Sequence, residues 1–245
     1  KSIRSALGPN LKWLACGGAP LNVDLAHFFN GMNDITFIQG YGMTETAAPF
    51  AATRVTDNVI GTVGQPAPGS SIRISDEGEL QVKGPNVFRG YHNLPEKTAE
   101  AFTADGWLRT GDLSEIDDEG HIVITGRIKD MIIRGGENVY PREIEEFLMG
   151  MPGVLDIQVV AVPSRKYGEE VGAFIIARPD VPVAPEDVRA FCRGKIAWYK
   201  IPRYIAVVDG FPLTASGKIQ KFKLREMAAE RWPEAMAEPD SKTAK

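Results

Sequence analysis

The spacing of the apolar residues changes twice along this 245-residue chain, and that change restricts its possible folds more than any other feature. Two short apolar runs at 12–16 and 36–41 end in or beside glycine and flank a helix-like stretch at 23–29, which predicts a βαβ-like unit. From 60 to 125, short segments alternate apolar and polar residues between Asp-Glu-Gly and Gly-Pro turns. These segments are 71–75, 79–83, 113–116 and 121–125. Their spacing predicts a small antiparallel sheet or barrel.

A third pattern begins after Arg127 and mixes helical with strand-like spacing. Pro141 opens a predicted helix whose apolar positions Ile144, Phe147 and Leu148 share one face. Strands are predicted at 154–162, 171–178 and 204–208, and a helix from Pro185 presents Val188, Phe191, Cys192 and Ile196 at helical spacing. Residues 234–245 lack periodicity and predict a disordered tail.

The expected fold class is therefore α/β and α+β, in two parts. The first predicted part is 1–128, with an α/β portion at 1–59 and a β-rich portion at 60–128. The second is a small α+β domain at 129–233.

The composition excludes several classes of protein. Twenty-eight basic and thirty-two acidic residues give a net charge of −4, without the basic stripe of a nucleic-acid binder. Cys16 and Cys192 are far apart and the three histidines are scattered, which disfavours zinc and disulfides and favours a reducing cytoplasm. No apolar run approaches the roughly 18 residues of a membrane span.

One polar cluster directly follows a predicted strand. In Tyr41-Gly42-Met43-Thr44-Glu45-Thr46, the ring of Tyr41 could stack on a ligand, Thr44 could bind phosphate and Glu45 could contact Mg²⁺. Ligands of open α/β sheets lie at this end of the strands. Alternatively, Thr44 caps a helix and Glu45 completes its first turn.

Three other motifs each allow two interpretations. Asp112, behind a glycine turn, could accept both ribose hydroxyls or form an Asx turn. The stretch Gly126-Arg127-Ile128-Lys129-Asp130 suits a solvated turn or a charged joint between domains. The Ser216-Gly217-Lys218 loop fails the phosphate-loop pattern, because position 212 is Pro and position 219 is Ile. Lys218 is then either a mobile charge for a polyanion or a solvated lysine.

Taken together in this order, the motifs closely resemble the adenylate-forming superfamily, which includes acyl-CoA synthetases. The resemblance spans residues 8–228 and rests on GGAP, YGMTET, GEL, GY, WLRTGDL, GRIKD, GGENVYP and SGKI. It implies an ATP-dependent ligase that joins a fatty acid to coenzyme A through an acyl-adenylate. The stretch 39–129 is most similar to long-chain ligases, and 131–227 to short-chain, medium-chain or aryl ligases.

The resemblance also implies roles for individual residues. Gly18 and Ala19 would border the adenine, Tyr41 would stack on it, and Gly42 would also bind the nucleotide. Thr44 would contact the α-phosphate and Glu45 would hold Mg²⁺. Asp112 would bind the ribose, and Arg127 would support ribose or phosphate. Lys218 would bridge the carboxylate and the α-phosphate during adenylation. Lys129 would be the hinge of a mobile second domain, which then brings Gly136 and Glu137 to the site for thioester formation.

The chain departs from the family in one respect: no Ser/Thr/Gly-rich phosphate loop occurs between Lys1 and Gly17. It therefore looks like the C-terminal half of a longer enzyme, and we expect the isolated chain to be inactive in adenylation. Exposed apolar surface is then expected on residues 1–60. Two alternatives remain open, an enzyme that loads an acyl carrier protein and a noncatalytic nucleotide-binding module.

Overall fold

The computed structural model describes residues 3–8, 10–19, 21–31, 35–47, 49–215 and 217–237. The chain divides into two compact units, Lys1–Thr125 and Gly126–Lys245. The division lies within strand β8 (Ile122–Arg127), just before the predicted boundary at 128–129.

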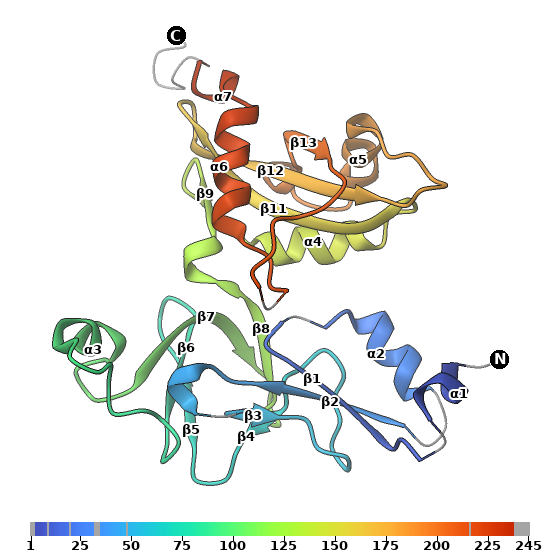
Figure 1. The fold of residues 1–245 in the computed structure, drawn as a ribbon. Coiled ribbons are helices and arrows are strands. Elements are labelled where there is room, and N and C mark those ends of the chain that lie inside the picture. The colour runs from blue at the N-terminus through green and yellow to red at the C-terminus, as the bar shows by residue number, and fades with distance from the viewer. Residues whose placement is uncertain are drawn as a thin grey trace. The chain divides into compact units, whose positions relative to one another are not determined.

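The first sheet of unit 1 contains the predicted βαβ unit, which is confirmed (Figure 1). Strands β1 (Trp13–Gly17) and β2 (Thr36–Tyr41) pair in parallel, with α2 (Val23–Asn30) between them in sequence. Asn22 caps α2, since its side chain accepts a hydrogen bond from the Leu25 amide at 2.9 Å. The remaining elements are α1 (Ile3–Leu7), β3 (Ala51–Ala52) and β4 (Gln65–Pro66).

The second sheet of unit 1 has the order β5-β6-β7-β8 and confirms the predicted antiparallel arrangement. Its first three strands are β5 (Ser71–Ile74), β6 (Glu79–Lys83) and β7 (Leu108–Ile116). Helix α3 (Pro95–Ala101) comes between β6 and β7 in the sequence. One core joins the two sheets, because Ala51 of β3 and the preceding Phe50 pack with Leu80, Val82 and Ile122 of the second sheet. Residues far apart in the sequence are thereby held in one compact unit.

Unit 2 is built on a sheet of order β10-β9-β12-β11 (Figure 1). Strand β13 also pairs with β12, on the edge of β12 opposite to β11. The strands are β9 (Ile132–Arg134), β10 (Glu137–Val139), β11 (Val154–Ser164), β12 (Gly168–Ala177) and β13 (Tyr204–Val207). The helices and turns are η2 (Ile128–Asp130), α4 (Pro141–Met149), α5 (Pro185–Cys192), η3 (Trp198–Lys200), α6 (Lys221–Arg231) and α7 (Glu234–Ala237).

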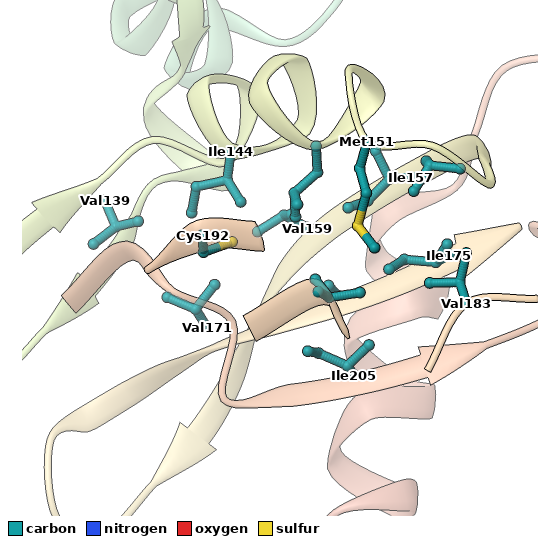
Figure 2. Packing of buried hydrophobic residues seen from close by; sticks show 14 of the residues in the cluster. Val139, Ile144, Met151, Ile157, Val159, Val171, Ile175, Val183, Cys192 and Ile205 are labelled. Atoms are coloured by element: carbon teal, nitrogen blue, oxygen red, sulfur yellow. The ribbon is translucent and has the colours of Figure 1, made fainter. Parts of the chain in front are cut away.

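Helices cover both faces of this sheet because side chains alternate along its strands. Figure 2 shows Val159 of β11 in one apolar cluster with Ile144 of α4 and Cys192 of α5. The next residue, Val160, packs in a second cluster with Leu224 of α6. Unit 2 is therefore a three-layer α/β/α arrangement.

The structure corrects two expectations about unit 2. The helix from Pro185 ends at Cys192, since Gly194 has a φ of +73°, and Ile196 reaches the core from outside the helix. The predicted disordered tail is wrong at its start, because Glu234–Ala237 form α7 and Ala235 is fully buried beside Trp232. Residues 238–245 lie outside the described residues.

Several large apolar side chains within residues 1–60 are exposed, as expected. They include Trp13 (62% exposed), Val23, Leu25, Phe28 and Val55. Strand β1 is also the edge of its sheet. In the described part of the chain, no helix is long and apolar enough to cross a membrane.

Candidate functional site

The carboxyl ends of β1 and β2 lie side by side, because the parallel register pairs Gly17 with Gly40. Gly18 follows β1 with a φ of +77°, and both Gly18 and Ala19 are exposed. Tyr41 and Gly42 follow at the end of β2 and are half-buried. Four predicted site residues thus share one rim of backbone at the end of the sheet.

Asp112 of β7 is brought to this rim from the second sheet. The Tyr41 phenol donates a 2.6 Å hydrogen bond to Asp112 Oδ2, although 71 positions separate the two residues. Asp112 directly follows Gly111, whose φ is +71°, and Asp112 is only 7% exposed. This hydrogen bond directly connects Tyr41, which is predicted to stack on adenine, with Asp112, which is predicted to bind the ribose.

Thr44 and Glu45 lie in a 3₁₀ turn, η1 (Thr44–Thr46). Thr44 does not cap it, because the residue before the turn is Met43 and Thr46 Oγ1 accepts the Met43 N–H at 3.0 Å. The Thr44 side chain is exposed, as a phosphate contact requires.

Glu45 is held on both its side chain and its backbone by the segment that follows β6. The Tyr91 phenol donates to Glu45 Oε1 at 2.7 Å, and the Phe88 amide donates to the Glu45 carbonyl at 2.7 Å. The hydrogen bond to Glu45 raises the pKa of Tyr91. Within the described residues, no group of three His, Cys, Asp or Glu side chains could hold a metal. A single carboxylate still fits Mg²⁺, which is commonly bound by one or two carboxylates together with substrate phosphates.

Sequence reasoning missed two supporting residues, Tyr91 and Glu79. Glu79 is buried in β6 and accepts the Gly111 amide at 3.0 Å and Arg109 Nη1 at 3.3 Å. It therefore supports the turn that presents Asp112. Glu79 shares the polar face of its strand with Gln81 and Lys83, so its burial has no signal in the sequence, and the Tyr91 contact has no local signal either.

The other predicted residues belong to unit 2 and lie on three separate segments. Arg127 ends β8 and Lys129 lies in η2, and both side chains are exposed. Lys218 is exposed on a loop closed by a bridge between Leu213 and Ile219, where its amide donates to Thr214 Oγ1 at 3.0 Å.

Gly136 and Glu137 belong to the hairpin of β9 and β10. Arg134 pairs with Glu137, so Gly135 and Gly136 form a two-residue turn, with φ values of +61° and +97°. A Cβ at Gly136 would meet nothing within 4 Å. Arg134 fixes the base of the turn by pairing with buried Glu170 and lying 4.1 Å from the ring centroid of Tyr167.

Comparison with known proteins agrees with this arrangement. The AMP-binding enzyme family matches residues 2–92, and the AMP-binding enzyme C-terminal domain matches residues 143–218. The putative acyl-CoA synthetase YngI of Bacillus subtilis (strain 168) is 47% identical over 214 residues, which are 82% of this chain and 39% of that protein. The mitochondrial medium-chain acyl-CoA ligase ACSF2 of Mus musculus is 41% identical over 225 residues, which are 85% of this chain and 36% of that protein.

A solved structure supports the same assignment. ATP-bound MatB from Rhodopseudomonas palustris matches with a TM-score of 0.85 and 37% identity, over 89% of this chain and 46% of that one. The chain spans less than half the length of each of these three proteins. On the sequence motifs, the fold and these matches, the chain belongs to the adenylate-forming family of AMP-binding enzymes.

Proposed function

We propose that these residues are the C-terminal portion of an ATP-dependent acyl-CoA synthetase that acts on a fatty acid. The observation that carries the proposal is the hydrogen bond between Tyr41 and Asp112 at the carboxyl ends of two parallel strands. This is where open α/β sheets bind nucleotides. An aromatic ring and a carboxylate there suit the two halves of adenosine.

In the proposed nucleotide site, Gly18 and Ala19 border the adenine, Tyr41 stacks on it, and Gly42 also contacts the nucleotide. Tyr41 is half-buried, and its hydrogen bond to Asp112 is made by the phenol oxygen, so stacking on the adenine would use a face of the ring. Asp112 accepts the ribose hydroxyls, and Arg127 supports ribose or phosphate. Thr44 donates to the α-phosphate.

The first half-reaction forms the acyl-adenylate. An oxygen of the fatty acid carboxylate attacks the α-phosphorus, the bond to the β-phosphate oxygen breaks, and pyrophosphate leaves. Lys218 counters the negative charge that builds up as carboxylate and phosphate approach. Glu45, oriented by Tyr91, would hold Mg²⁺, and the positive charge of this ion would offset the negative charge of the phosphates.

The second half-reaction forms the thioester. The sulfur of coenzyme A attacks the acyl carbonyl, the carbon–oxygen bond to AMP breaks with its electron pair leaving on the AMP phosphate, and the thiol proton passes to solvent. We propose that unit 2 rotates about Lys129 between the steps and replaces Lys218 with Gly136 and Glu137. An exposed two-glycine turn without side chains suits close passage of the pantetheine arm.

Two alternative functions differ from this proposal, one in the acceptor of the acyl group and the other in having no catalytic activity. The acyl group could go to the phosphopantetheine of an acyl carrier protein, or the chain could only bind a nucleotide. The medium-chain ligase among its relatives favours free coenzyme A and a fatty acid of moderate length.

A direct test measures ATP–pyrophosphate exchange by the complete enzyme across fatty, aryl and small dicarboxylic acids. We expect exchange with fatty acids, followed by thioester formation with free coenzyme A. If exchange occurs but the acyl group is transferred only to a phosphopantetheinylated carrier protein, the carrier protein and not coenzyme A is the acceptor. AMP binding without exchange for any acid would instead support the noncatalytic module.

A further inference from the structure

Arg225 of α6 holds the backbone that directly follows the proposed pivot. Its Nη2 atom donates to the Lys129 carbonyl at 2.6 Å and to Asp130 Oδ1 at 2.6 Å. The Asp130 side chain is only 14% exposed and that of Arg225 is 34% exposed, so the ion pair is partly shielded from water. By contrast, the Lys129 side chain is exposed. The backbone of Lys129 is therefore fixed on its carbonyl side while its side chain is not.

Helix α6 is itself anchored to the rest of unit 2. Leu224 and Ala228 are fully buried in the cluster that includes Val160 and Phe174. Lys221, one turn before Arg225, pairs with Glu145 of α4 at 2.7 Å. The loop that carries Lys218 leads directly into this first turn of α6. Arg225 thus connects the peptide after Lys129 to the same helix that carries the Lys218 loop.

We propose that Arg225 is a positioning residue that confines the rotation of unit 2 to the backbone torsions of Lys129. Because Arg225 fixes the Lys129 carbonyl and Asp130 to α6, everything from that carbonyl onward moves as one body with α6. The two torsions of Lys129 then lie at the boundary between fixed and moving backbone. Without Arg225 the flexible segment extends past Asp130, and Lys218 returns to the site less accurately. This inference rests on the proposed two-step function and adds a residue to it.

The first experiment tests the local claim without any enzymatic assay. The Met131 amide closes η2 by bonding to the Arg127 and Ile128 carbonyls at 3.1 and 3.3 Å. In Arg225→Gln we expect hydrogen–deuterium exchange of this amide to rise at least tenfold, while amides in β11 and β12 keep their protection. Arg231→Gln, an exposed arginine at the end of the same helix, is the matched control and should change neither. Unchanged exchange at Met131, or equal acceleration throughout unit 2, would overturn the proposal.

The second experiment tests the consequence for catalysis in the complete enzyme. We expect Arg225→Gln to lower kcat for acid-dependent pyrophosphate release roughly tenfold or more with little change in the KM for ATP, because misplacement of a catalytic group by about 1 Å has such effects. Asp130→Ala should give a similar loss, the double variant should be no worse than either single variant, and Arg225→Lys should recover part of the rate.

Additive losses in the double variant, or unchanged rates despite faster exchange at Met131, would refute the positioning role. If the wild-type enzyme released no pyrophosphate with any acid, the proposed function would fail, while the exchange experiment would still decide whether Arg225 fixes this segment.

Discussion

At the scale of single residues, the Tyr41–Asp112 contact connects the two halves of the proposed nucleotide site. Asp112 is nearly buried, and hydrogen bonds to charged groups are worth about 1.5–3 kcal/mol. The Tyr41 phenol therefore fixes the carboxylate before any nucleotide binds. This arrangement separates the orienting role of the phenol from the binding role of the carboxylate.

Two substitutions test these roles through AMP binding. Tyr41→Phe keeps the ring but loses the hydrogen bond, so we expect AMP to bind about fivefold more weakly, for a loss of about 1 kcal/mol. Asp112→Asn should weaken binding more than tenfold, because it removes the charged acceptor. Calorimetric titration measures both, with the exposed Asp118→Asn as the control. Equal affinities for the wild type and Asp112→Asn would remove Asp112 from the site.

Tyr91 orients Glu45 in the same way, and its substitution should affect the metal dependence. Because its pKa is raised above 10, the phenol stays protonated and keeps donating to Glu45 throughout the range of pH 6 to 9. Tyr91→Phe should raise the Mg²⁺ concentration for half-maximal pyrophosphate release several-fold, equally at pH 6 and pH 9. A Mg²⁺ dependence identical to that of the wild type would show that Tyr91 only supports the fold.

At the scale of secondary-structure elements, His121 connects the turn before β8 to the 53–58 segment. The ring is 1% exposed, with Nδ1 2.9 Å from Asp117 and Nε2 3.2 Å from Asp57. Burial alone would lower the pKa of His121, but the hydrogen bonds with Asp117 and Asp57 outweigh it and raise the pKa. Only the protonated imidazole can donate to both carboxylates.

This pKa shift predicts a specific dependence of stability on pH. The contribution of protonated His121 is complete below about pH 6.5 and is lost as the pH rises through the raised folded-state pKa. The pKa of Asp117 is lowered, mainly by the His121 backbone amide, so its contribution is lost only as the pH falls below about 3.9. We expect the melting temperature of unit 1 to fall between pH 6 and 9 in the wild type and in the exposed control His27→Gln. His121→Gln should remove this fall, and a wild-type melting temperature constant over that range would contradict the assignment.

The Gly135–Gly136 hairpin allows backbone strain to be separated from function. Gly136→Ala meets no neighbouring atom, so its structural cost is the positive φ alone, about 1 kcal/mol. Gly194→Ala is a matched control, because Gly194 has a φ of +73° and also has open space around its Cβ position. Both variants should lose similar stability, measured by urea unfolding. Only Gly136→Ala should slow thioester formation from supplied acyl-adenylate, and equal rates in the two variants would count against a pantetheine passage there.

Helices and strands could be predicted where the local spacing of apolar residues determines them, whereas contacts between distant residues could not. Strands β1 and β2 followed from apolar runs with terminal glycines, and α4 from its one-sided apolar face. The sequence did not reveal α6, since only Leu224 and Ala228 of its residues are buried. The contacts of Asp112, Glu45 and Lys129 join positions far apart in the sequence, so they arise only when the sheets and helices pack.

At the scale of the whole molecule, the family motifs fall into two units. The residues proposed to bind the nucleotide lie mostly in unit 1, whereas Lys218, Gly136 and the proposed pivot at Lys129 all lie in unit 2. One unit would thus hold the adenylate while the other supplies different residues for each half-reaction. The chain covers 39% of YngI, and Trp13 of β1 and three apolar residues of α2 are exposed in unit 1.

The most direct test of this account is a pair of rates for Lys218→Ala in the complete enzyme. The account predicts that pyrophosphate release on mixing acid with ATP falls on the order of 10²- to 10³-fold, because the lysine charge acts only while carboxylate and phosphate converge. Thioester formation from supplied acyl-adenylate and coenzyme A should stay close to the wild-type rate, and Lys223→Ala, an exposed lysine of α6, should leave both rates unchanged. An equal loss in both half-reactions of Lys218→Ala would contradict the assignment of separate residues to the two steps.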